Sequence, residues 1–121
     1  MTLRIALARA KKRGVAIGHF NFSDTATLRA ISAAACAQDV PVIVGTSEGE
    51  REFWGPCGAV AAVRHLREEH RIPIFINADH THSFEKVQEA VQAGYDAILF
   101  DGGKLPLAEN IRETKRVVAY V

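Results

Sequence analysis

The sequence has 121 residues, of which 48% are hydrophobic, and its 15 basic and 14 acidic side chains leave a formal net charge of +1. These values are typical of one globular domain, and the scattered charges give no sign of a nucleic-acid partner or a membrane surface. No apolar run approaches the roughly 18 residues that cross a bilayer. The two cysteines, Cys36 and Cys57, lie in no metal-binding spacing. We therefore expect a cytoplasmic protein with reduced cysteines.

Helical and strand-like patterns alternate along the chain. An amphipathic segment, 2–13, predicts a helix before the first strand. Apolar runs then recur and are almost continuous, as is typical of strands covered on both faces in a parallel sheet. The expected strands are VAIGHFNF (15–22), PVIVGTS (41–47), PIFINAD (73–79) and YDAILFDGG (95–103).

Each apolar run is followed by a helical pattern with a recognisable start. Capping residues or a first-turn proline mark these starts, and Gly94 supplies a left-handed stop for one of the helices. The expected helices are 25–38 after Ser23 or Asp24, the segment to residue 70 beginning at Pro56, 84–93 after Ser83, and 107–121 after Pro106.

This order, a helix followed by four βα units, indicates an α/β fold with parallel strands joined by right-handed crossovers. Two architectures fit: a small doubly wound sheet, or the first four βα units of a (β/α)8 TIM barrel preceded by an N-terminal helix. Length by itself favours the first, since a barrel typically needs about 250 residues. No glycine-rich nucleotide loop supports it, however. The last helix stops abruptly at Val121, and we expect from this that the chain is cut short.

Polar residues gather where the expected strands end. In parallel α/β folds the carboxyl ends of the strands bind the ligand, so we expect these side chains to converge on one rim. Side chains alternate along a strand, which predicts that Asp79 and His80 point to different sides while His80 and His82 share one. The polar strand-end residues are His19, Asn21, Thr46, Ser47, Glu48, Asn77, Asp79, His80, His82 and Asp101, with Gly102 and Gly103 after it.

The stretch NADHTH (77–82) has the residue types of a metal-assisted site. The neutral imidazole of His80 would be a good zinc ligand, and an unligated carboxylate beside it, Asp79, would suit proton transfer. Structural interpretations stay open at this point. The histidine could be a hydrogen-bonded structural group, Asp79 or Ser47 a helix cap, and Asp101 a residue that shapes a turn.

The segments GHFNFSD (18–24), VPVIVGTSEGE (40–50), PIFINADHTHSFEKVQEAVQAGYDAILFDGG (73–103) and LPLAENIRETKRVV (105–118) carry a resemblance. With them the chain resembles the class II, metal-dependent fructose-bisphosphate aldolases and their ketose-bisphosphate aldolase relatives. The resemblance implies a (β/α)8 barrel, a Zn²⁺ cofactor, and reversible cleavage of fructose 1,6-bisphosphate, a small-molecule phosphosugar. The products are dihydroxyacetone phosphate and glyceraldehyde 3-phosphate, which belong to glycolysis and gluconeogenesis.

The resemblance also implies roles for individual residues. His80 matches the first zinc ligand, and Asp79 matches the acid/base that exchanges a proton with the C4 hydroxyl. Ser47 matches a residue that contacts the bound triose phosphate, and Asn21 matches an asparagine near the substrate. Asp101 matches an acidic residue close to the metal, in its outer shell or at an alternate site. His19, His82 and Gly103 depart from the family pattern and carry no role over.

The family takes its remaining zinc ligands, a proton-abstracting glutamate and a phosphate loop from later strands. We therefore expect residues 1–121 to be the amino-terminal half of the barrel, inactive alone, and a homodimer when complete. Two alternatives remain: a non-catalytic half barrel that associates through its open edge, and a metal-dependent hydrolase that uses His80 and His82 as paired ligands. The choice between fructose and tagatose bisphosphate is left open.

Overall fold

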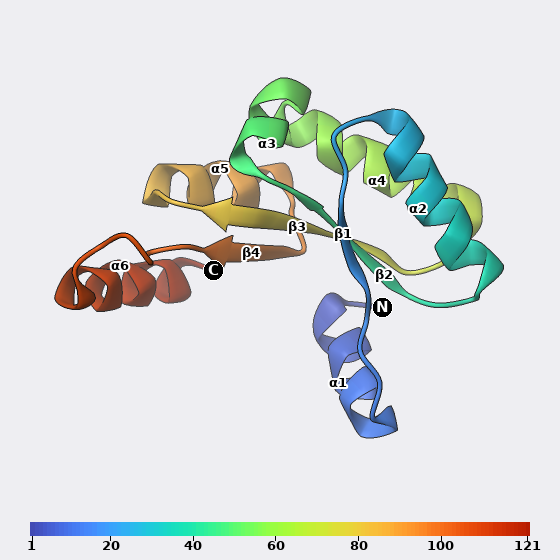
Figure 1. The fold of residues 1–121 in the computed structure, drawn as a ribbon, viewed down its shortest axis with the longest axis horizontal. Helices are drawn as coiled ribbons and strands as arrows, with labels where there is room; N and C mark the ends of the chain where they lie inside the picture. Colours follow the sequence, from blue (N-terminus) through green and yellow to red (C-terminus); the bar gives the residue numbers. More distant parts are fainter.

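The computed structural model describes residues 1–121 as a four-stranded parallel sheet flanked by helices (Figure 1). The strands are β1 (His19–Asn21), β2 (Val42–Thr46), β3 (Ile74–Thr81) and β4 (Ala97–Phe100). They lie side by side in chain order, β1-β2-β3-β4, and every neighbouring pair is parallel. A doubly wound sheet reverses its strand order at a switch point, whereas a barrel does not. The sheet is therefore the half-barrel arrangement of the first four βα units.

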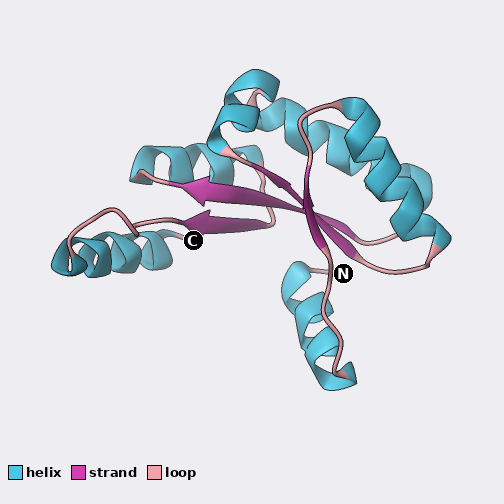
Figure 2. Ribbon diagram, in the orientation of Figure 1, coloured by secondary structure: helices cyan, strands magenta, loops and turns pink.

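The helices begin and end where local signals place them (Figure 2). Asp24, rather than Ser23, caps its helix by accepting a hydrogen bond from the Thr27 N–H at 2.7 Å. Ser83 caps another, which stops at Gly94 with a φ of 92°. These predictions are confirmed. The helices are α1 (Leu3–Arg13), α2 (Thr25–Ala37), α3 (Glu48–Trp54), α4 (Pro56–His70), α5 (Phe84–Ala93) and α6 (Leu107–Tyr120).

Helix α3 was not predicted, although its start carries a signal. The Ser47 hydroxyl accepts from the Glu50 N–H, and the Glu50 carboxylate accepts from the Ser47 N–H at 2.6 Å. This reciprocal pair is a capping box, which satisfies two backbone donors at a helix start. The Ser-x-x-Glu spacing at 47–50 was therefore the missed signal.

The strands differ in length from the predicted runs because pairing, not apolar character, sets their ends. β1 pairs with β2 only from His19 to Asn21, so the predicted strand 15–22 is too long. The predicted strand 95–103 shortens to β4, since the Tyr95 N–H bonds back to the end of α5. β3 instead extends two residues beyond the predicted 73–79, to Thr81.

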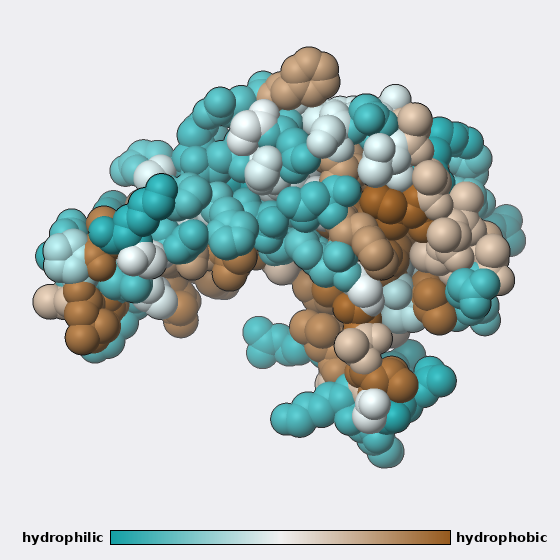
Figure 3. Space-filling model, in the orientation of Figure 1, coloured by the Kyte–Doolittle hydropathy of each residue, from teal (hydrophilic) through white to brown (hydrophobic).

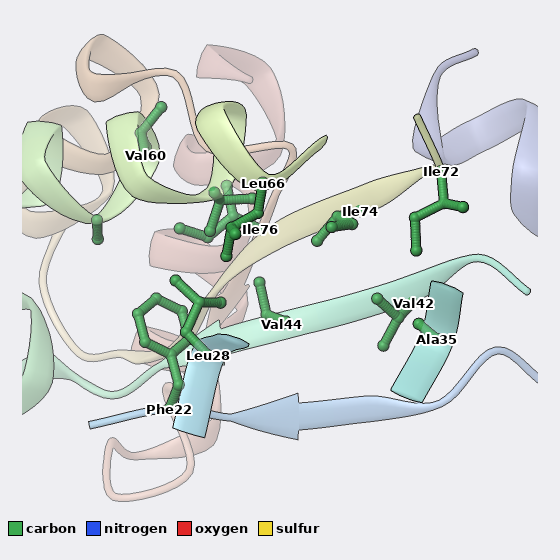
Figure 4. Packing of buried hydrophobic residues seen from close by; sticks show 12 residues of the cluster. Phe22, Leu28, Ala35, Val42, Val44, Val60, Leu66, Ile72, Ile74 and Ile76 are labelled. Carbon is green, nitrogen blue, oxygen red and sulfur yellow. The ribbon is translucent and has the colours of Figure 1, made fainter. Parts of the chain in front are cut away.

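Two hydrophobic clusters fix the sheet between its helices. On the outer face, side chains from β2 and β3 pack against α2 and α4 (Figure 4). On the opposite face, Leu3 and Ala6 of α1 pack against Phe75, so α1 lies under the sheet, away from α2 and α4 (Figure 1). The labelled residues of the outer cluster are Phe22, Leu28, Ala35, Val42, Val44, Val60, Leu66, Ile72, Ile74 and Ile76.

The half barrel leaves apolar surface at both of its open edges. Beside β1, apolar atoms gather along α2 (Figure 3), where a groove is lined by residues that include Phe20, Ile31 and Val40. Beyond β4, Leu107 and Val118 of α6 are 75% and 68% exposed. In a completed barrel, further βα units would cover such edges. None of the helices has both the length and the apolar composition to span a membrane.

Candidate active site

Four of the predicted site residues meet at the carboxyl rim of the sheet. β3 carries Asp79 and His80, β1 ends with Asn21, and Asp101 directly follows β4. Asn21 Nδ2 donates to Asp79 Oδ2 at 3.0 Å, and His80 Nδ1 lies 3.0 Å from Asp101 Oδ2. Residues from three strands thus form one continuous polar constellation, as the strand-end argument predicts.

A glycine on β2 makes the contact between Asn21 and Asp79 possible. Asn21, Gly45 and Asn77 share one register across the sheet, so Asn21 must reach over β2 to touch β3. A Cβ at Gly45 would lie 2.3 Å from Asn21 Oδ1 and 2.6 Å from His19 Nε2. Because Gly45 has no side chain, the Asn21 and His19 side chains can occupy the space above it.

The backbone at His80 departs from the ideal strand that the alternation argument assumed. His80 has a φ of 100°, and the pairing of β3 with β4 shifts register between Ala78 and Thr81. This β-bulge turns the His80 ring to the rim that Asp79 faces, with Nε2 4.0 Å from Asp79 Oδ1. The prediction that Asp79 and His80 point to different sides is therefore wrong.

The contact with Asp101 fixes the protonation pattern of the His80 ring. An ionised carboxylate only accepts hydrogen bonds, so Nδ1 must carry the proton and donate to Asp101. In the neutral ring, Nε2 then carries the free lone pair, 4.0 Å from Asp79 Oδ1. The pKa of Asp101 lies below its ordinary value, because the Gly103 N–H and the His80 ring hydrogen-bond to its charged form.

His82 and Glu48 extend the constellation toward α3. His82 Nε2 lies 3.6 Å from Asp101 Oδ2, so His80 and His82 share one side, as predicted. Glu48 accepts from the His82 N–H at 2.8 Å and lies 3.3 Å from His82 Nδ1. Partial burial raises the pKa of Glu48, but the hydrogen bonds from His82 outweigh that effect and leave the pKa below its ordinary value.

Two predicted rim residues turn away from this constellation. The Ser47 hydroxyl caps α3, which is the structural alternative that the sequence left open, and no hydrogen bond joins it to Asp79, His80 or Asp101. Thr46 is fully buried, and its hydroxyl lies 2.9 Å from the Tyr95 hydroxyl in the helix layer. The expectation that all strand-end polar groups line the rim is therefore wrong for Thr46.

Sequence reasoning missed Arg51 entirely. This residue of α3 is only 4% exposed, and its guanidinium contacts the ends of both β2 and β3. An arginine in the charged segment EGERE gives no sequence signal of burial. Its position depends on how α3 packs against the sheet.

The residues present fit one ligand of a metal site. His80 has an accessible nitrogen, and a carboxylate orients the other ring nitrogen, as is usual for metal-binding histidines. No group of three or more His, Cys, Asp or Glu side chains is arranged to hold a metal ion. A catalytic zinc site usually takes three protein ligands, and in residues 1–121 His80 is the one candidate with this arrangement.

The family model described as fructose-bisphosphate aldolase class-II matches residues 1–121. The chain belongs to the class II fructose-bisphosphate aldolase family. It is 37% identical over 115 residues to a probable fructose-bisphosphate aldolase of Bacillus subtilis, which covers 93% of the chain and 40% of that relative. A fructose-bisphosphate aldolase of Staphylococcus aureus is 35% identical, over 99% of the chain and 43% of the relative.

A family member with another named substrate is equally similar. A 6-phospho-5-dehydro-2-deoxy-D-gluconate aldolase of Shouchella clausii is 38% identical, over 94% of the chain and 40% of the relative. The chain therefore spans less than half the length of these relatives, whose names give different substrates.

Solved structures of aldolases share the fold. The YdjI aldolase of Escherichia coli superposes with a TM-score of 0.88 at 24% identity, over 99% of this chain and 47% of that one. A protein from Coccidioides immitis whose structure is titled "a putative fructose-1,6-biphosphate aldolase" gives 0.84 at 22% identity, over 96% of this chain and 46% of that one. At such identities the match supports the half-barrel fold and no finer assignment.

Proposed function

We propose that residues 1–121 form the amino-terminal half of a zinc-dependent class II aldolase that cleaves fructose 1,6-bisphosphate reversibly. The observation that carries the proposal is the rim constellation in which Asn21 contacts Asp79, Asp79 adjoins His80, and His80 contacts Asp101. Family membership supports aldol cleavage as the reaction, and this constellation offers candidate groups for proton transfer and for one metal ligand.

Asp79 is the group proposed to move a proton. Cleavage of the bond between C3 and C4 requires a base that removes the proton from the C4 hydroxyl, and reversal requires the same group as an acid. The Asp79 side chain is about one-fifth exposed, and Asn21 binds only its Oδ2. Asp79 Oδ1 therefore remains available to the substrate hydroxyl.

His80 is the proposed zinc ligand, through Nε2. Asp101 is a proposed outer-shell residue, which accepts a hydrogen bond from His80 Nδ1 and so keeps the imidazole proton on that nitrogen. A bound divalent metal would supply a Lewis acid for the negative charge that develops on the substrate carbonyl oxygen. Asp79 Oδ1 lies 4.0 Å from His80 Nε2, so the proposed base would stand beside that charge.

Ser47 is proposed to contact the triose phosphate, from the resemblance of the TSEG segment alone. Its backbone N–H is already bound by Glu50, so this role falls to its hydroxyl, which only accepts in the capping bond and keeps its own O–H to donate to the phosphate. The choice among fructose, tagatose and other phosphorylated ketoses is not set by these residues, and the similarity to the Shouchella clausii aldolase favours testing several.

The second half of the barrel is proposed to supply the other zinc ligands, the phosphate loop and the cover for both open edges. Residues 1–121 alone should be inactive for this reason, and the completed enzyme should act as a homodimer in cytoplasmic glycolysis or gluconeogenesis. The apolar groove beside β1 and the exposed Leu107 and Val118 of α6 support an incomplete barrel.

The test uses the completed barrel, defined as residues 1–121 followed by the second four βα units of its own gene or of the Bacillus subtilis relative. Zinc content and cleavage of fructose 1,6-bisphosphate are measured before and after chelation. Asp79→Ala should abolish cleavage and retain zinc, whereas His80→Ala should lose zinc. Loss of zinc in both His80→Ala and His82→Ala, together with an Asp79→Ala variant that remains active, would favour the paired-histidine hydrolase instead.

A further inference from the structure

Arg51 is a buried cation whose hydrogen bonds all go to neutral oxygen atoms. Nη1 donates to the Thr46 carbonyl and, at 3.1 Å, to the Asp79 carbonyl, while Nη2 donates to Thr81 Oγ1 at 3.1 Å. Only 4% of the residue is exposed. Burying a guanidinium without a paired carboxylate is costly, and its hydrogen bonds must offset the loss of water. The positions of its three acceptors therefore indicate what Arg51 stabilises.

These acceptors lie on both sides of the strained residue of the site. His80 is a non-glycine residue with a φ of 100°, in the stretch where the β3–β4 register shifts. Such a conformation persists only where the surroundings enforce it. Arg51 binds the carbonyl immediately before His80 and the side chain immediately after it.

The same guanidinium also ties this stretch to β2. Regular pairing between β2 and β3 ends at Thr46 and Ala78, one residue before Asp79. By binding the Thr46 and Asp79 carbonyls together, Arg51 continues the connection between the strands past the last paired residues. A planar fork presents donors from separate nitrogens to acceptors on two strands, whereas the three donors of a lysine ammonium all radiate from one nitrogen.

We propose that Arg51 is a positioning residue, which holds the backbone of residues 79–81 in the conformation that presents Asp79 and His80 together at the rim. Arg51 lies in the layer behind the sheet and does not touch the substrate. The importance of Arg51 for catalysis rests on the proposed function of Asp79 and His80. Its effect on the His80 backbone is independent of that function.

Arg67 offers a matched control at the other end of the same strand. From α4 its Nε donates to the Ile74 carbonyl, at the start of β3, at 2.7 Å, and its Nη2 donates to Asp96 at 2.8 Å. It therefore anchors a helix to β3 as Arg51 does, but far along the strand from the rim. If Arg51 had a purely structural role, replacing either arginine would change zinc affinity and kcat to the same extent.

The experiment compares Arg51→Met, Arg51→Lys and Arg67→Met in the completed barrel. Arg51→Met should lower zinc affinity and kcat by roughly 10- to 100-fold, the usual effect of removing support behind a metal ligand, with a smaller change in KM. Arg51→Lys should recover little of this loss. Arg67→Met should lower the unfolding midpoint and leave zinc affinity and kcat unchanged.

Wild-type zinc affinity and kcat in Arg51→Met, or equal losses in Arg67→Met, would overturn the proposal. If Arg51→Met does not fold, Thr81→Val removes one acceptor and should lower zinc affinity in the same direction; an unchanged affinity would count against Arg51. Metal-free crystals of Arg51→Lys give a readout independent of the reaction. His80 should leave the positive-φ region there, even if the wild-type barrel cleaves no sugar phosphate, and an unchanged φ would refute the proposal.

Discussion

Asn21 and Asp79 are 58 residues apart in the chain and lie on strands that are not neighbours, yet their side chains form a 3.0 Å hydrogen bond. β2 runs between them and contributes Gly45 at the crossing point, where a side chain would fill the space. One layer below, His19 and Asn77 make the same crossing at 3.3 Å. The inner face of this sheet thus carries two polar rungs directly beneath the proposed substrate position.

Removing the amide at position 21 should impair catalysis without removing metal. In the completed barrel, Asn21→Ala frees the Asp79 carboxylate from its orienting donor, and the loss of a hydrogen bond to a charged group corresponds to a roughly 10- to 100-fold fall in kcat/KM. Steady-state cleavage kinetics with zinc content measured in parallel check this. Asn77→Ala, which removes the lower rung, is the control and should have a smaller effect. Equal losses in the two variants would refute the assigned role.

Filling the gap on β2 should reproduce that loss. Gly45→Ala places a methyl group on Asn21 Oδ1 and His19 Nε2, so both side chains must move, at a cost of about 1–3 kcal/mol in unfolding free energy. Urea denaturation and cleavage kinetics measure the two effects. Gly49→Ala in α3 meets no atom within 4 Å and should be neutral or slightly stabilising. A Gly45→Ala barrel with full activity would show that the Asn21–Asp79 contact is dispensable.

Asp101→Asn should weaken zinc binding through the tautomer of His80. The asparagine carbonyl can keep the bond from the Gly103 N–H, 2.9 Å from Asp101 Oδ1, and its NH₂ group then faces His80 Nδ1. Nδ1 becomes an acceptor, the ring proton moves to Nε2, and zinc affinity falls roughly 10- to 100-fold. Competition with a fluorescent chelator measures it. His82→Ala, which leaves the His80–Asp101 bond intact, should retain zinc; a loss there as large as in Asp101→Asn would contradict this explanation.

Folding stability should fall in acid, partly through Glu50. Burial raises the pKa of Glu50, but hydrogen bonds from the Ser47 N–H and the Ser23 hydroxyl outweigh it, so its pKa in the folded state lies below the ordinary value of 4.5. Its contribution is present above that value and disappears as pH falls through the lower folded pKa. Urea unfolding between pH 7 and pH 3 should therefore show a steeper loss in the wild type than in Glu50→Gln, where this carboxyl no longer titrates. Parallel curves for the two proteins would contradict the assignment.

Much of the fold follows from the sequence because the signals are local. Apolar runs marked all the strands, and capping residues such as Asp24 and Ser83 marked helix starts, since a cap acts on backbone donors within one turn. Ser47 was recognised as a possible cap, but the Ser-x-x-Glu capping box that predicts α3 was not. The NADHTH stretch directed attention to Asp79 and His80 for a similar reason: residue type and strand-end position are both readable along the chain.

The tertiary structure alone decided how these residues meet. The βα pattern by itself allowed a doubly wound sheet or a half barrel; the family resemblance implied the barrel, and the strand order confirms it. Strict alternation along β3 predicted that Asp79 and His80 point to opposite sides. The bulge at His80 instead depends on the pairing of β3 with β4 and on the hydrogen bond from Arg51, and both partners are distant in sequence. The space above Gly45 likewise depends on the register of three strands. Residue type and helix caps can be predicted from neighbouring residues, whereas strand register, burial and the convergence of side chains depend on pairing between distant segments.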